Sequence, residues 1–156
     1  MAYYCRVLQS SDIEEILKFE EQKLQELIPD ESERMFASWN SRARREALEH
    51  YSQLGWSFLA RDSQKPNEFS SEGTLVGYFL GQPLLFFEGQ TQSLWVEHIQ
   101  TSNEQASMEL IDLAYRLSRE KHFQKVFLPK GASGLPPVSF ENWQPQVLTA
   151  KTTKAL

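Results

Sequence analysis

The segment 93–130 constrains the fold most, because it reads as strand, helix and strand in succession. Residues 93–100 (SLWVEHIQ) are rich in β-forming side chains, 103–121 carry apolar residues at helical intervals, and 124–130 (QKVFLPK) are a short apolar-centred strand. Two strands joined by one helix run parallel in the same sheet, because the helix brings the chain back to the end of the sheet at which the first strand began. The sequence therefore predicts a sheet with a parallel pair.

The rest of the chain predicts two helices and a run of antiparallel strands. In order, we expect a strand over 2–8, a helix over 11–28, a helix over 31–54 with a break near 39–41, strands over 56–62 and 74–81, a bend at 82–83, a turn at 90–92, and a last strand or two within 143–156. The predicted class is α/β (α+β): a mixed, mostly antiparallel central sheet flanked by helices, in the order β-α-α-β-β-β-α-β-β. We expect a single domain over 1–156.

Composition limits the kinds of partner that this chain can have. The formal net charge of −5 gives no basic surface for nonspecific nucleic-acid binding. No apolar run approaches the roughly 20 residues of a membrane span, and no signal peptide is visible, so we expect a cytoplasmic protein without a membrane partner. The single cysteine, Cys5, excludes an intramolecular disulfide, and three scattered histidines predict no metal site. The sequence leaves a homodimer open.

Three sequence segments, in this order along the chain, are similar to segments of a known family. Gly73–Tyr78 (GTLVGY) resembles the start of the family's third strand, Arg119–Leu128 its helix running into the fifth strand, and Phe140–Trp143 (FENW) its segment near the C-terminus. With the element order, they make the chain resemble the GCN5-related N-acetyltransferase (GNAT) superfamily over nearly its whole length. The resemblance implies transfer of an acyl group from acetyl-CoA or another acyl-CoA to an amine on a small molecule or a peptide.

The resemblance also places the acyl-CoA pyrophosphate at the start of the helix over 103–121. Family members bind it with a loop Q/R-x-x-G-x-G/A, whose backbone N–H groups and glycines let phosphate approach closely. The matching residues are Ser102, Asn103, Glu104, Gln105, Ala106 and Ser107, and Ile99 in the preceding strand is a further expected cofactor contact. None of the six is glycine, Glu104 adds negative charge, and Thr101 and Ser102 each have capping-box spacing to a residue three positions on. We therefore expect a helix that caps itself and binds CoA weakly.

Two residues of the strand over 93–100 are candidate catalytic groups. The resemblance implies a glutamate there as general base, which in this chain is Glu97. Alternation predicts one face with Trp95, Glu97 and Ile99 and another with Leu94, Val96 and His98. A carboxylate among apolar neighbours takes up a proton more readily than one in water, which suits a base; the alternatives are a rim carboxylate or one hydrogen-bonded to a neighbour. His98 is the second candidate, against a structural role.

The family's general acid, a tyrosine near the C-terminus, has no counterpart, because no tyrosine follows Tyr115 and Phe140 cannot donate a proton. A thiol is a tolerable leaving group without such help. The basic residues Arg42, Arg44 and Arg45 suit either an acidic substrate or a solvated helix face. The sequence thus predicts an acyl-CoA-dependent N-acyltransferase of GNAT type. The alternative is a catalytically inactive binding or assembly module of the same fold that has lost the CoA pyrophosphate loop.

Overall fold

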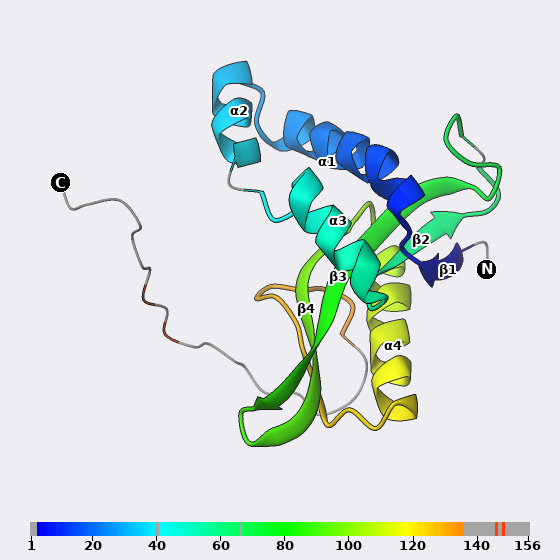
Figure 1. The fold of residues 1–156 in the computed structure, drawn as a ribbon. Helices are drawn as coiled ribbons and strands as arrows, with labels where there is room; N and C mark the ends of the chain where they lie inside the picture. The colour runs from blue at the N-terminus through cyan, green and yellow to red at the C-terminus, as the bar shows by residue number, and fades with distance from the viewer. Residues whose placement is uncertain (1–2, 40, 66, 136–145, 147, 149–156) are drawn as a thin grey trace.

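The computed structural model describes residues 3–39, 41–65, 67–135, 146 and 148, and the fold is given for these residues. Figure 1 shows how the strands and helices are arranged in space. In order they are β1 (Tyr3–Val7), the short 3₁₀ helix η1 (Ser10–Asp12), α1 (Ile13–Leu27), α2 (Glu31–Trp39), α3 (Arg45–Leu54), β2 (Phe58–Asp62), β3 (Thr74–Phe87), β4 (Gln90–Thr101), α4 (Glu104–Glu120) and β5 (Lys125–Phe127).

The strands form one sheet in the order β1-β2-β3-β4-β5. Neighbours from β1 to β4 are antiparallel, while β4 and β5 are parallel and are joined through α4. The predicted mixed, mostly antiparallel sheet flanked by helices is therefore confirmed, together with the parallel pair. The expected last strand or strands within 143–156 lie outside the described residues, apart from Gln146 and Leu148.

The sheet separates two apolar clusters, each under its own helices (Figure 1). On one side, which we call the α1/α3 face, Ile16 and Leu48 pack against Tyr78 of β3. On the opposite side, the α4 face, Leu110 packs against Leu94 of β4. Because apolar stripes on three helices are buried in this way, the helices hold the sheet from both sides and fix the position of β4.

Helix boundaries follow the sequence signals with one difference. Gly55 ends α3 with φ +78°, as a C-capping glycine does, and the expected break in the second helix separates α2 from α3. The predicted start of α1 at Ser11 is wrong, because η1 comes first. Gln9 and Asp12 form the capping box of η1, in which the backbone N–H of Gln9 donates to Asp12 Oδ2 at 2.8 Å.

The β3–β4 hairpin is longer than the sequence suggests. β3 runs through Pro83 to Phe87, and the turn lies at Glu88 and Gly89, both with positive φ, so the predicted turn at 90–92 is wrong. Gly89 tolerates this backbone conformation best, which explains why the chain reverses there. The predicted irregularity at 82–83 lies slightly earlier in the register, between Leu80 and Gly81.

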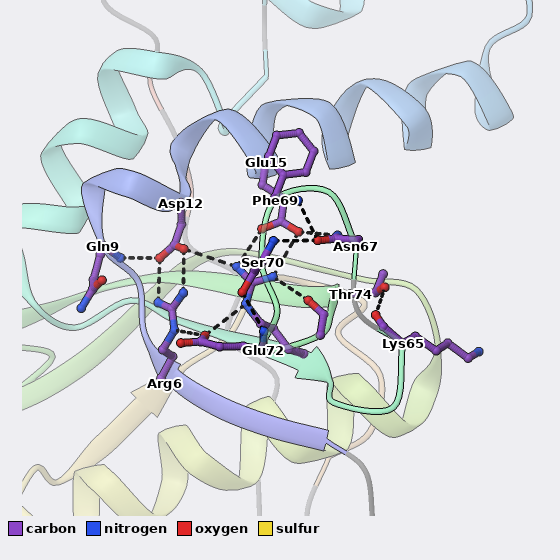
Figure 2. A network of polar contacts seen from close by, with 12 residues as sticks. Arg6, Gln9, Asp12, Glu15, Lys65, Asn67, Phe69, Ser70, Glu72 and Thr74 are labelled. Carbon is purple, nitrogen blue, oxygen red and sulfur yellow. Dashed lines mark hydrogen bonds and ion pairs between the residues drawn. The ribbon is translucent and has the colours of Figure 1, made fainter.

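A network of buried charges holds the start of α1 to β2 and to the loop between β2 and β3. Arg61 of β2 is 1% exposed. Its guanidinium donates to Glu15 Oε1 at 2.7 Å and to the Gly73 carbonyl at 3.0 Å. The side-chain amide of Asn67 donates to Glu15 Oε2 at 2.8 Å (Figure 2). The loop is thus fixed by polar contacts to a helix carboxylate.

Asp12 belongs to the same network (Figure 2). It accepts two hydrogen bonds from Arg6, at 2.7 and 2.8 Å, and the charge of Arg61 lies 3.4 Å away. Burial by itself raises the pKa of Asp12, but the hydrogen bonds from Arg6 and Gln9 and the two arginine charges outweigh it, so this pKa is lowered. Asp12 is therefore charged in the folded protein.

Candidate functional site

The strand β4 contains a bulge at Glu97. Neighbouring residues of β3, Leu80 and Gly81, pair with His98 and Val96, so Glu97 is the extra residue between two ladder positions. A bulge of this kind bends its strand and shifts the alternation of side chains by one residue. The side chains on either side of Glu97 consequently follow different alternations.

The bulge overturns the predicted faces of β4. Leu94 and Val96 lie in the α4-face cluster, but His98 lies on the α1/α3 face, its ring centroid 5.7 Å from that of Tyr78. Ile99 packs on the α4 face and does not share the face of Glu97. The predicted grouping is therefore wrong at His98 and Ile99, and its result is that Glu97 and His98 lie on the same side of the sheet.

Both carboxylate oxygens of Glu97 accept hydrogen bonds. Oε2 accepts from the indole N–H of Trp95 at 2.7 Å, and Oε1 accepts from Nε of Arg42 at 3.1 Å. The side chain is 30% exposed, so the apolar surroundings that we expected are wrong and the alternative of a carboxylate bonded to its neighbours applies. Tyr51 of α3 lies close by: burial first, and the charge of Glu97 second, raise the pKa of Tyr51.

A carboxylate from α1 faces His98. Oε1 of Glu20 lies 3.2 Å from Nε2 of His98, and the same oxygen accepts a hydrogen bond from the Tyr78 hydroxyl. The side chains of Glu20 and His98 are 12% and 19% exposed. Burial, and then Glu20, hold the pKa of Tyr78 well above its ordinary value, so this hydroxyl keeps its proton and remains a donor. Three elements, α1, β3 and β4, thus meet in one polar group.

The parallel strands separate beside these side chains. β5 pairs with β4 only at Ser93, Leu94 and Trp95, whereas β4 continues to Thr101. Within the described residues, 96–101 therefore have no strand on the β5 side, and we call this stretch the open edge. An open edge offers backbone N–H and C=O groups to an extended ligand. It begins next to Glu97 and leads to the start of α4.

The start of α4 is capped by its own sequence. Oδ1 of Asn103 accepts from the backbone N–H of Ala106 at 2.8 Å, and the carbonyl of Asn103 accepts from the N–H of Ser107 at 3.3 Å. The expectation of a helix that caps itself is confirmed, but the capping residue is Asn103 and not Ser102 or Thr101. One of the donors that an anion would use at a helix start, the N–H of Ala106, is therefore already bonded, while the bond from Ser107 is the first regular bond of the helix.

A segment after β5 covers the same helix end. The hydroxyl of Ser107 donates to the carbonyl of Ser133 at 2.6 Å. Gly134, at φ +76°, approaches α4 so closely that a Cβ there would lie 2.8 Å from the backbone nitrogen of Met108. Of the predicted pyrophosphate residues, Ser102, Asn103 and Glu104 are exposed, Gln105 is half-buried, and Ala106 and Ser107 are buried. The first turn of α4 therefore leaves little room for a closely bound pyrophosphate.

The remaining candidates are dispersed. Arg42 lies in the turn before α3 and bonds Glu97, Arg44 precedes α3 and lies 3.7 Å from Glu46, and Arg45 pairs with Glu14 of α1 at 2.6 Å, so these basic residues do not form one helix face. The part of the chain that the structure describes holds no group of three or more histidine, cysteine, aspartate or glutamate side chains placed to bind a metal ion. In that same part, every helix is too short or too polar to cross a bilayer.

Comparisons with known proteins give the fold. None of the protein-family models matches this chain, and no curated protein matches it. Among solved structures, a ribosomal-protein-alanine N-acetyltransferase from Brucella melitensis biovar Abortus 2308 superposes with a TM-score of 0.55, at 17% identity over 96% of this chain and 99% of that chain. This chain has the GNAT fold. A GNAT family acetyltransferase from Staphylococcus aureus subsp. aureus USA300_TCH1516 gives 0.53, at 13% identity over 94% and 100% of the two chains.

A third structure with the GNAT fold is an aminoglycoside acetyltransferase from an uncultured soil metagenomic sample, in complex with sisomicin. It superposes with a TM-score of 0.54 at 15% identity, covering 96% of this chain and 97% of that chain. At these identities the likeness establishes the architecture and leaves the chemistry to the residues of this chain.

Sequence reasoning missed the partners of both candidate catalytic residues. Arg42, Tyr51 and Tyr78 come from distant parts of the chain, and 78 residues separate Glu20 from His98. Glu20 did carry a signal, because it stands four residues after the buried Ile16 on the apolar stripe of α1. A carboxylate in the middle of such a stripe needs a partner in the fold.

Proposed function

We propose that this protein is an N-acyltransferase, which moves an acyl group from an acyl-CoA thioester to an amine on a small molecule or a peptide. One observation carries the proposal: the open edge of β4 begins where the bulge brings Glu97 and His98 together on the α1/α3 face. A donor extended along the open edge would bring its thioester to two proton-accepting side chains, and an amine would arrive from the α1/α3 face.

The reaction needs few catalytic groups from the protein. The thioester supplies an activated carbonyl carbon, and a lysine-like amine, with a pKa near 10.4, must lose a proton before it attacks. Glu97 and His98 are the groups in reach to accept that proton, and Arg42 and Trp95 orient the Glu97 carboxylate. Ile99, on the open edge, would contact the donor arm.

The capped start of α4 favours a second function, a non-catalytic binding or assembly module of the same fold. Asn103 and the segment at Ser133 occupy positions that a pyrophosphate would need. In this case the protein would bind a partner and transfer nothing. The two functions differ in thiol release, which only the transferase catalyses.

Thiol release separates the two functions. The purified chain is incubated with acetyl-CoA and a panel of primary amines, which includes polyamines, an aminoglycoside and lysine-containing peptides, and free thiol is measured. The transferase predicts amine-dependent thiol release that the double variant Glu97→Gln/His98→Gln abolishes. A chain that shows no release above the double variant with any amine, and no thermal stabilisation by CoA, acetyl-CoA or longer acyl-CoAs, is the binding module; a ligand at a hundred times its Kd should add about 2.7 kcal/mol.

A further inference from the structure

We propose that His98 is the proton acceptor of the transfer reaction and that Glu20, a residue of α1, positions it. This inference rests on the proposed transferase function. It assigns the base to one of two candidates and adds a positioning residue from an element that the sequence did not connect with the site.

The geometry fixes which nitrogen of His98 carries the proton. An ionised carboxylate only accepts hydrogen bonds. Oε1 of Glu20 faces Nε2 of His98 at 3.2 Å and also receives the Tyr78 hydroxyl proton. Nε2 is therefore the protonated nitrogen in the neutral ring, and Nδ1 keeps its lone pair. Among the described residues no hydrogen bond occupies Nδ1, so it is available to a substrate.

The surroundings of His98 keep this arrangement rigid. Tyr78 is fully buried, its ring contacts the His98 ring, and its hydroxyl holds Glu20 in place. A carboxylate that fixes the tautomer and orientation of a histidine is the arrangement that lets an imidazole act as a base in several unrelated sites. His98 is still 19% exposed, so a substrate can reach the ring.

Glu97, by contrast, is already engaged. Its two oxygens accept from Trp95 and Arg42, so each oxygen already has one donor from the protein. We assign Glu97 to substrate binding: a carboxylate beside His98 on the α1/α3 face attracts the positive charge of the incoming amine. In this assignment Glu97 attracts the amine and His98 accepts its proton.

The reaction balances with these roles. One proton of the substrate ammonium passes to His98 Nδ1, and the freed lone pair on nitrogen bonds to the thioester carbonyl carbon. The carbon–sulfur bond breaks, its electron pair stays on sulfur, and the second N–H proton ends on the thiol. The products are an amide and a thiol, and His98 returns its proton to water.

The test compares Glu20→Gln and His98→Gln with the matched control Glu21→Gln, the same substitution on the next, exposed residue of α1. Rates of thiol release from acetyl-CoA are measured from pH 6 to 9 with the best amine of the panel. We expect kcat to fall about 100-fold for His98→Gln and about tenfold for Glu20→Gln, with KM for acetyl-CoA unchanged. The deficit of His98→Gln should shrink toward pH 9, where more of the amine is already neutral; a purely structural effect would stay constant.

A double variant, Glu20→Gln/His98→Gln, should be no slower than His98→Gln alone, because Glu20 acts only through His98. The assignment is overturned if the rate losses of the two single variants multiply in the double variant. It is also overturned if Glu20→Gln is as fast as Glu21→Gln. In both cases the transferase function stands. Absence of transfer by the wild type overturns both together. A second readout needs no activity: ¹⁵N NMR of the imidazole should show Nε2 protonated in the neutral ring, and the opposite tautomer contradicts the proposal.

Discussion

Two groups of charged residues lie at opposite ends of the sheet and differ in how their charges are held. At the β1–β2 end, Arg61 and Glu15 are buried, and each has several polar partners. At the β4–β5 end, Glu97 and His98 are partly exposed, and His98 has one nitrogen without a hydrogen bond to the described residues. A buried charge with several polar partners holds the structure together, whereas a partly exposed group that retains an unused acceptor is available for chemistry.

The comparison also separates two uses of arginine. Arg61 is 1% exposed and contacts a helix, a loop and two carboxylates, while Arg42 is 65% exposed and makes one ion pair. Removing a partner from a buried ion pair costs far more than removing an exposed one, because the remaining charge stays desolvated. Variants at the two ends of the sheet should therefore differ in how much stability they lose.

Replacement of Arg61 gives the largest expected effect. Arg61→Met keeps a side chain of similar volume but leaves Glu15 buried with Asn67 as its one donor among the described residues. We expect the free energy of unfolding to fall by about 3–5 kcal/mol in urea or guanidinium titrations. A loss below about 1 kcal/mol would mean that the buried charge network contributes little to the stability of the fold.

Acid should weaken the same network. The folded-state pKa of Asp12 is lowered, so Asp12 contributes stability that is complete above its unfolded value of about 3.9 and is lost as pH falls through the folded value. Asp12→Asn should be less stable than wild type at pH 7 by about 2 kcal/mol, and the two should converge below about pH 4. Unfolding curves at each pH from 2.5 to 7 measure this, and a constant gap would contradict it.

The start of α4 should gain CoA affinity when its side chains are removed. The triple variant Glu104→Lys, Gln105→Gly and Ser107→Gly reverses one charge, removes two side chains next to the backbone N–H groups and releases the hydroxyl bond to Ser133. We expect CoA to bind about tenfold more tightly, which is about 1.4 kcal/mol, as measured by calorimetric titration. Wild-type binding at micromolar Kd or better would show that the capped helix does not exclude the pyrophosphate.

Loss of the exposed pair gives the smallest expected effect on stability. Arg42→Ala removes the contact to Glu97 Oε1, and the free energy of unfolding should change by less than about 1 kcal/mol. In the transfer assay the same variant should alter KM for the amine more than kcat, since Glu97 would have an unoccupied oxygen. A loss of stability as large as that of Arg61→Met would remove the distinction between the two ends.

Much of the architecture could be predicted from sequence because local signals specify it. The strand–helix–strand spacing of 93–130 gave the parallel pair, and Gly55 gave the end of α3. The self-capping start of α4 was also foreseeable, though not that Asn103 would be the cap, because capping-box spacing favoured the residues before it.

The candidate site was predicted only in part. Glu97 and His98 stand on one strand, but alternation assigned them to opposite faces, since a bulge leaves no mark in the sequence of β4 alone. It arises from pairing with β3, which is a property of two strands together. Glu20 and Tyr78 join the site through tertiary contacts that no local pattern encodes.

The bulge also has a consequence for how the gene can change. Loss of the single codon for Glu97 would restore regular pairing between β3 and β4, because Leu80 and Gly81 already pair with His98 and Val96. Val96 and Ile99 would stay on the α4 face and His98 would stay beside Tyr78, so the deletion would remove the carboxylate and leave the histidine in place. One residue of insertion therefore separates two forms of the same protein, both with the histidine on the Glu20 side and one of them with a second carboxylate next to it. A lineage could cross between them in one mutational step.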